Sequence, residues 1–173
     1  MKRLLVVLVA GLVVLGLVAA PALAGRNGPA GKSNVAQLYL YEKDPSDWSI
    51  VEGGAWGKMT YNLSGPEFAF VFNGHGLEAN TNYSLIYYAD PWPGNNPGAL
   101  IASGTTNAGR NIHLAGATEL NTDLPNSSDD NFLGGAKIWL VLSSDYQAPN
   151  MVGWNPTKYL FESNLITYDD TDL

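Results

Sequence analysis

Two tryptophans of this chain lie in segments rich in Pro, Gly and Asn. Trp92 belongs to PWPGNNPG and Trp154 to VGWNPTK. An indole on a loop can stack on the flat face of a sugar ring, and the amides of Asn95 and Asn155 could then bond its hydroxyls. The alternative is that both indoles pack over one end of the fold. The other tryptophans are expected to be structural: Trp48, Trp56 and Trp139.

Acidic residues gather in the long polar segment NTDLPNSSDDNFLGG, residues 121–135. Calcium takes six to eight oxygen ligands, commonly from Asp and Asn on a tight loop. Asp123, Asp129 and Asp130 could supply them, although the order of ligands in an EF-hand loop is absent. The other interpretation is a solvated acidic loop.

Nothing in the chain has the pattern of a nucleophilic active site. There is no G-x-S-x-G segment, no phosphate-binding Gly loop and no Cys. Sixteen Asp and Glu residues leave a chance pair of glycosidase type open. We expect a protein that is not an enzyme and has no cofactor, with calcium as the alternative.

Three triplets match the N-x-[ST] pattern of N-glycosylation acceptors. They begin at Asn62, Asn82 and Asn126. The first two fall in expected strands or corners, whereas Asn126 lies in the long loop and is the best candidate.

The first 24 residues have the three-part layout of a signal peptide. Lys2 and Arg3 precede an apolar run over residues 4–20, and Ala22-Leu23-Ala24 offers a small-x-small cleavage site. Since the apolar run approaches the length of a membrane-spanning helix, an uncleaved anchor is the alternative. Either way, the rest of the chain is expected outside the cell.

Size and charge limit the remainder to one exported domain. The whole chain has 173 residues, a formal net charge of −7 and no Cys. About 150 residues can bury a core without disulfides, and the acidic balance disfavours nucleic acid as a partner. No further apolar run is long enough to place the mature domain in a membrane.

The elements that must position these residues are predicted to be strands. Apolar residues alternate with polar ones over residues 36–41, 58–63 and 137–142, which places alternate side chains on one core face. The runs FAFVF (68–72) and LIYY (85–88) are apolar on both faces and read as central strands. We therefore divide the chain into a linker (25–34), a β-sandwich domain (35–168) and an acidic tail (169–173).

The segment LEANTNYSL, residues 77–85, resembles the corner of fibronectin type III and immunoglobulin-like domains. The resemblance implies that the Tyr83 hydroxyl bonds to the backbone a few residues upstream, that Leu77 fills the core and that Thr81 shapes the turn. The family usually has Pro where Ala79 stands. It also implies an immunoglobulin-like sandwich of two sheets, here with about eight or nine strands.

The chain as a whole is similar to a set of uncharacterised secreted prokaryotic β-sandwich proteins that share segments such as AWGKMTYNLSG and GWNPTKYLFE. The expected function is that of a secreted or cell-surface structural or adhesive module, whose partners would be cell-surface proteins or glycans. The alternatives are a carbohydrate-binding module and a calcium-stabilised extracellular domain. The sequence leaves the oligomeric state open.

Overall fold

The computed structural model describes residues 33–91 and 98–173, and this part of the chain is all-β. The predicted signal peptide, most of the predicted linker, Trp92 and Asn95 lie outside the described residues. Among the described residues, no helix has the length and apolar character to cross a membrane.

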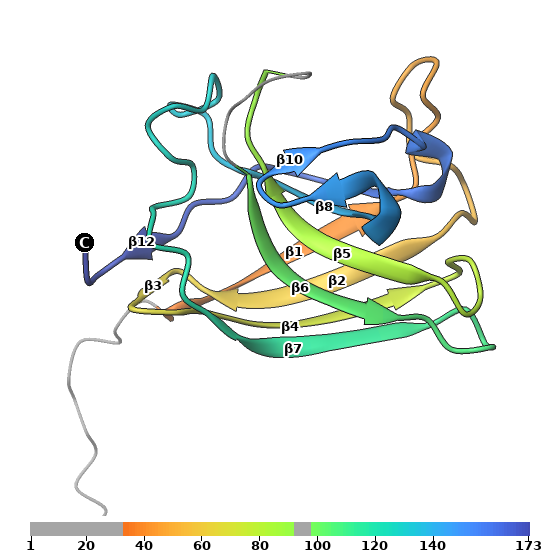
Figure 1. The fold of residues 1–173 in the computed structure, drawn as a ribbon, viewed down its shortest axis with the longest axis horizontal. Helices are drawn as coiled ribbons and strands as arrows, with labels where there is room; N and C mark the ends of the chain where they lie inside the picture. Colours follow the sequence, from red (N-terminus) through yellow and green to blue (C-terminus); the bar gives the residue numbers. More distant parts are fainter. Residues whose placement is uncertain (1–32, 92–97) are drawn as a thin grey trace, which may run out of the picture. The chain divides into compact units, whose positions relative to one another are not determined.

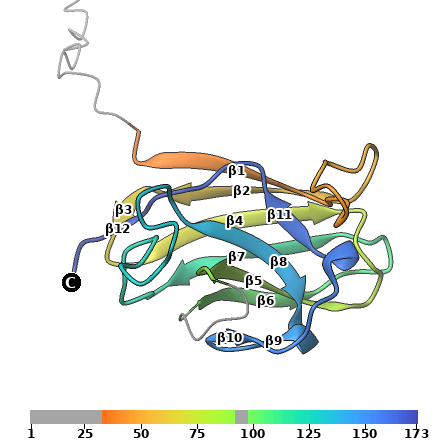
Figure 2. The same cartoon turned by 90° about the horizontal axis from the view of Figure 1, so that it is seen from above.

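Eight strands pair antiparallel in one continuous sheet, in the order β6-β5-β8-β11-β1-β2-β4-β7. Figures 1 and 2 show these strands wrapping round a common interior. Their bounds are β1 Val35–Tyr41, β2 Trp56–Asn62, β4 Phe68–His75, β5 Asn82–Tyr88, β6 Ala99–Thr105, β7 Ile112–Thr118, β8 Lys137–Leu142 and β11 Leu160–Glu162.

Shorter elements lie around this sheet. The strands β3 (Ser64–Gly65) and β12 (Asp169–Asp170) pair parallel at one end, and β9 (Tyr146–Gln147) pairs with β10 (Asn150–Met151) as a small hairpin. Two 3₁₀ turns, η1 (Ser143–Asp145) and η2 (Pro156–Lys158), precede β9 and β11. The predicted acidic tail is thus partly built into β12, where Asp170 is buried.

The sheet curls until its two edge strands, β6 and β7, touch, so that it is nearly a barrel. Their contact is made by side chains: the Thr118 hydroxyl donates to the Ile101 carbonyl at 2.9 Å. At Gly104, a Cβ would lie 2.6 Å from the Leu114 side chain, so the absence of a side chain lets β6 approach β7 closely. We expected two separate sheets, but β1 pairs with both β11 and β2 and joins the two halves into one.

The predicted alternation places the expected residues in the interior. Leu38 and Leu40 of β1, Met59 of β2, and Ile138 and Leu140 of β8 are fully buried in one core cluster. Alternate side chains of a strand point to opposite faces, so one face of each strand lines the interior. A curled single sheet and a sandwich have the same alternation, which is why the sequence did not distinguish them.

The two runs predicted to be apolar on both faces behave differently. In β5, Leu85 to Tyr88 are buried throughout, because the outer face is covered. In β4, the phenylalanines are buried but the alternate residues are exposed, with Val71 43% exposed. Hydrophobicity alone therefore does not show which outer face another segment covers.

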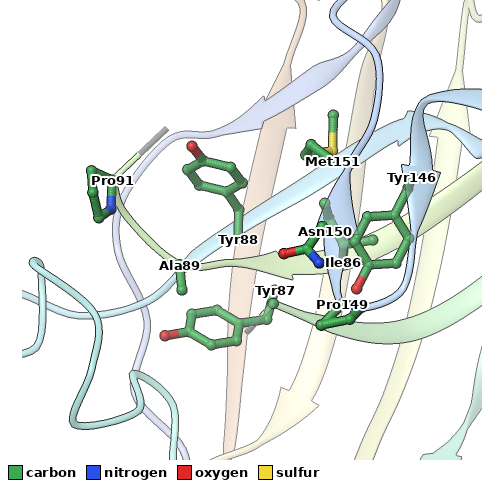
Figure 3. Close-up of a pocket in the computed structure, with 10 residues that line it drawn as sticks. Ile86, Tyr87, Tyr88, Ala89, Pro91, Tyr146, Pro149, Asn150 and Met151 are labelled. Carbon is green, nitrogen blue, oxygen red and sulfur yellow. The ribbon is translucent and has the colours of Figure 1, made fainter. Parts of the chain in front are cut away.

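A second apolar cluster lies on the outer face of β5, β8 and β11. Its buried members are Ile86, Tyr88, Trp139, Val141, Tyr159 and Phe161. Figure 3 shows Tyr87 and Tyr88 leaving β5 on opposite sides, one toward the interior cluster and the other toward this outer cluster. The wall of the barrel is therefore packed on both faces at these three strands.

The corner before β5 is closed by the Tyr83 hydroxyl. Tyr83 is 1% exposed, and its hydroxyl oxygen accepts a hydrogen bond from the Glu78 backbone N–H at 3.4 Å. Leu77 is buried in the interior cluster, and the Thr81 hydroxyl donates to the Ala79 carbonyl at 3.0 Å. Burial raises the pKa of Tyr83, so the phenol stays protonated.

Substitution Tyr83→Phe should lower the free energy of unfolding by about 1 kcal/mol, because it leaves the Glu78 N–H without its acceptor while the ring still fills its site. Urea unfolding of the two proteins measures this difference. Tyr39→Phe is the matched control, since Tyr39 is 37% exposed. Equal loss in both variants would contradict the role of the corner.

Candidate functional site

The outer face of β5, β8 and β11 carries an open groove of about 390 Å³ lined mainly by aromatic rings. This size lies within the range of about 300–1,000 Å³ that is usual for small-molecule sites. We call it the aromatic groove, and its lining residues are Lys43, Trp48, Tyr88, Asp90, Lys137, Trp139, Trp154, Phe161 and Glu162.

The floor of the aromatic groove follows from the strand register. Phe161 on β11 lies opposite Trp139 on β8, and Lys137 on β8 lies opposite Tyr88 on β5. The Tyr88 ring stacks on the Trp139 indole with centroids 3.8 Å apart and planes inclined by 10°. Phe161 meets Trp139 edge to face at 5.2 Å. All three rings are nearly buried, so the floor is a rigid aromatic surface.

Two exposed indoles form the rim of the aromatic groove. Trp48 is 48% exposed and Trp154 is 39% exposed, and their centroids lie 6.3 Å apart. Each ring also contacts the floor: Trp48 meets Phe161 edge to face at 5.2 Å, and Trp154 lies 5.9 Å from Trp139. These contacts hold the indoles in place while leaving much of their surface open to solvent.

Trp48 is held by a tight turn in the loop between β1 and β2. Its backbone N–H donates to the Asp44 carbonyl at 2.7 Å, and the Asp44 carboxylate accepts from the Ser46 N–H at 2.8 Å. Trp48 has a φ of 62°, a left-handed conformation that is unfavourable for a bulky residue. Such a conformation persists only where its surroundings enforce it, and it is commonest at functional sites.

Trp154 is held by a buried polar cluster centred on Asp145. The Asn155 amide and the Tyr159 hydroxyl both donate to the Asp145 carboxylate, at 2.7 Å and 2.5 Å. The Asn155 backbone N–H in turn donates to the Tyr159 hydroxyl at 2.9 Å. Burial would raise the pKa of Asp145, but hydrogen bonds from Tyr159 and Asn155 outweigh it and lower the pKa. The carboxylate therefore stays ionised and fixes the loop that carries Trp154.

Charged groups complete the aromatic groove at its edge. Lys137 forms an ion pair with Asp90, which also accepts from the Asn131 amide. The Lys137 ammonium lies 5.9 Å from the centroid of the Tyr88 ring. Lys43 donates to the backbone carbonyl of Glu162 at 2.9 Å. Both lysines are thus held beside the aromatic floor.

Glu162 lines the aromatic groove with a carboxyl whose pKa is raised. Burial raises the pKa of its carboxyl to about 7, against the opposing effects of its own backbone N–H, of Lys43 and Lys137, and of the Trp139 indole N–H. Its Oε2 atom is buried and makes no hydrogen bond of ordinary geometry with any described residue. Glu162 therefore exchanges a proton near neutral pH inside a ligand-sized groove.

The other hollows of the described residues are less suitable for a ligand. The one drawn in Figure 3, between β5 and the β9–β10 hairpin, has room for about 10 Å³, roughly the space of one water molecule. A hollow of about 400 Å³ beside Leu120 and Asn126 offers amides and hydroxyls but no aromatic ring. A hollow of about 180 Å³ does combine the rings of Tyr83 and Tyr159 with charged groups, but it is less than half the size of the aromatic groove.

The predicted sugar-binding residues have different places. Trp154 lines the aromatic groove, whereas Asn155 does not line it and instead donates its side-chain amide to Asp145. Trp92 and Asn95 lie outside the described residues. Trp48 and Trp139 were predicted to be structural, and Trp139 is indeed buried in the outer cluster, but both also line the groove. Only the pairing of β8 with β11 brings Trp139 to Phe161, and sequence spacing does not reveal this pairing.

The structure does not bring the predicted calcium ligands together. Both carboxylate oxygens of Asp129 are already engaged, by the Tyr87 hydroxyl on one side and by the backbone N–H groups of Asp90 and Asn131 on the other. Asp123 accepts from the Asp170 N–H, and Asp130 is exposed. Within residues 33–91 and 98–173, no three acidic, His or Cys side chains are grouped as metal ligands.

The three predicted glycosylation acceptors also differ in their surroundings. The Asn62 side-chain nitrogen donates to the carbonyls of Ser64 and Glu67, so modification there would remove two hydrogen bonds. The Asn82 side-chain oxygen accepts from the Thr105 hydroxyl on the neighbouring strand. Asn126 is half-buried in its loop, where its side-chain oxygen accepts from the Ser128 N–H.

Comparison with known proteins found no matching family model, no matching curated protein and no matching solved structure.

Substitution Asp145→Ala should lower the free energy of unfolding by about 2–3 kcal/mol, because it leaves the buried Tyr159 hydroxyl and the Asn155 amide without their acceptor. In the unaltered protein, the part of this stabilisation that depends on the charge of Asp145 is present above the ordinary Asp pKa near 4 and is lost as the pH falls through the lower folded-state pKa.

Urea unfolding at neutral pH measures this loss, and Trp fluorescence follows the loop. Asp130→Ala is the control, since Asp130 is exposed. A variant at Asp145 as stable as the control would show that the cluster does not hold the Trp154 loop.

Proposed function

We propose that this protein is an exported, non-catalytic binding module whose aromatic groove holds a saccharide. The observation that carries the proposal is the pair of exposed indoles, Trp48 and Trp154, fixed above a buried aromatic floor. The ligand class best suited to it is a β-1,4-linked oligosaccharide, because a pyranose ring with equatorial substituents presents flat C–H faces that stack on indoles.

The charged edge of the aromatic groove supports this choice. Sugar hydroxyls both donate and accept, and hydrogen bonds to charged groups are stronger than those between neutral groups. Lys43 and Lys137 offer donors, while Asp90 and Glu162 offer acceptors, around one aromatic surface. A purely apolar ligand would leave these groups poorly solvated, which disfavours a lipid.

The rigidity of the site supports binding as well. The turn at Asp44 and the Asp145 cluster order both loops before any ligand arrives, so binding costs little conformational entropy. Export is supported by the leader pattern of residues 1–24. An acidic, extracellular module that binds glycans could also serve adhesion.

A structural role through self-association is favoured by one separate observation. Val35 and Val71 are 53% and 43% exposed and lie on one shallow apolar surface that spans β1, β2, β4 and β7, and none of its lining residues lines the aromatic groove. Such a patch is a common feature of protein interfaces. Sedimentation of the protein beside Val71→Lys tests it, because the variant should shift any oligomer toward the monomer.

Binding is tested by titrating cellohexaose, xylohexaose and chitohexaose while following Trp fluorescence. We expect at least one of them to bind. Trp48→Ala and Trp154→Ala should each weaken that binding by about tenfold or more, a loss of about 1.4 kcal/mol. The fluorescence should change on binding, because the indoles would exchange water for the sugar face.

Trp56→Ala is the matched control. Trp56 is 41% exposed, similar to both rim tryptophans, but it packs against His75 outside the aromatic groove. Circular dichroism checks that all variants fold. Absence of binding by all three oligosaccharides, or full affinity in both rim variants, would rule out the proposed function.

A further inference from the structure

Glu162 has an acceptor atom that the described protein does not use. Its Oε2 atom is buried and lacks a hydrogen-bond partner among the described residues, although the residue lines the aromatic groove. Buried polar atoms in folded proteins are nearly always paired, and an ionised carboxylate can accept several hydrogen bonds. The Trp139 indole N–H lies near enough to lower the pKa of this carboxyl, but neither it nor Oε2 makes a hydrogen bond of ordinary geometry with a described residue. An ionised carboxylate has several acceptor positions, so at a ligand-sized groove one of them is open to a donor from the ligand.

The two lysines near Glu162 bond groups other than its carboxylate. Lys43, from the segment after β1, donates to the backbone carbonyl of Glu162 and not to its carboxylate. Lys137, from β8, pairs with Asp90, which follows β5. These two lysines lower the pKa of Glu162 without cancelling the effect of burial.

The remaining neighbours of Glu162 in the groove are aromatic, and one of them, Trp139, has an indole N–H that lowers the pKa of Glu162. The loops on either side contribute Trp48 and Trp154, which carry no charge. Tyr88 stays a neutral phenol at neutral pH, because burial raises its pKa. Within the part of the chain that the structure describes, the ionisable residues that line the aromatic groove are thus Glu162, Asp90, Tyr88 and the two lysines.

We infer that Glu162 is the specificity-determining acceptor of the aromatic groove: its ionised carboxylate accepts a hydrogen bond from a sugar hydroxyl, so that binding releases a proton and strengthens as the pH rises through neutrality. This inference rests on the proposed function and specifies how the same site is regulated.

Binding should strengthen as the pH rises, because the two protonation states of Glu162 differ as hydrogen-bond acceptors. In the ionised form the oxygen is a strong acceptor for a hydroxyl, whereas the protonated form loses the charge-assisted bond. Its pKa of about 7 means that both forms are populated near neutral pH. If only the ionised form binds well, affinity falls in proportion to its population, about tenfold between pH 8 and pH 6.

The test is calorimetric titration of the full protein with the oligosaccharide that binds best among cellohexaose, xylohexaose and chitohexaose. For the unaltered protein, we expect the Kd to rise about tenfold from pH 8 to pH 6. Titrations at pH 6 in buffers of different ionisation enthalpy should show the release of about one proton per ligand, and at pH 9 almost none.

Glu162→Gln should remove the pH dependence and weaken binding at pH 8. Glu78→Gln is the matched control, since Glu78 is a partly exposed acid that pairs with Lys158 outside the aromatic groove and should leave the pH profile unchanged. Proton release is measured on the unaltered protein, so it decides the inference even if Glu162→Gln fails to fold.

The outcomes separate the two proposals. Binding that depends on Trp154 but has the same Kd at pH 6 and pH 8 and releases no proton would overturn the role of Glu162 and leave saccharide binding intact. Stronger binding at pH 6 than at pH 8 would overturn it too. Failure of all three oligosaccharides to bind would overturn both saccharide binding and the role of Glu162.

Discussion

The outer face of β5, β8 and β11 is apolar, and the fold depends on its being covered from water. A sheet that curls on itself buries one face in its interior and normally leaves the other to water. Here Trp139, Val141 and Phe161 make the outer face apolar as well. The segments between β8 and β11 and between β1 and β2 lie over it, and their incomplete cover is the aromatic groove.

This constraint explains why the two ordered loops carry tryptophan. A large flat ring covers much apolar surface with few rotatable bonds, so Trp48 and Trp154 can shield Phe161 and remain partly exposed. Each loop then needs its own polar anchor, since neither has a helix or a long strand to support it. Asp44 supplies one and Asp145 the other.

Prediction from sequence worked where the signal is local. Alternation identified the strands that contain Leu38, Met59 and Leu140, and all three are fully buried. It failed for the outer face of β4, where Val71 is exposed, because coverage depends on which distant segments return to the sheet. The same limit hid the pairing of β1 with β11 across more than a hundred residues, and with it the joining of all eight strands into one sheet.

The candidate site was predictable in kind but not in composition. A tryptophan in a loop rich in Pro and Gly indicated a binding surface, and Trp154 does line the aromatic groove. Trp139 gave no such signal, because in sequence it is one residue of an alternating strand. Glu162 gave none either, since its raised pKa arises from burial beside residues that are distant in the chain.

Three departures from ordinary packing coincide at the aromatic groove. Trp48 holds a left-handed backbone, two large indoles remain partly exposed, and a buried oxygen of Glu162 makes no hydrogen bond of ordinary geometry with the described residues. Each is unfavourable for the free protein, and none is required by the curled sheet itself. Natural proteins keep such local conflicts mainly where function needs them. A bound sugar would relieve two of them together, by covering the indoles and by supplying the missing donor.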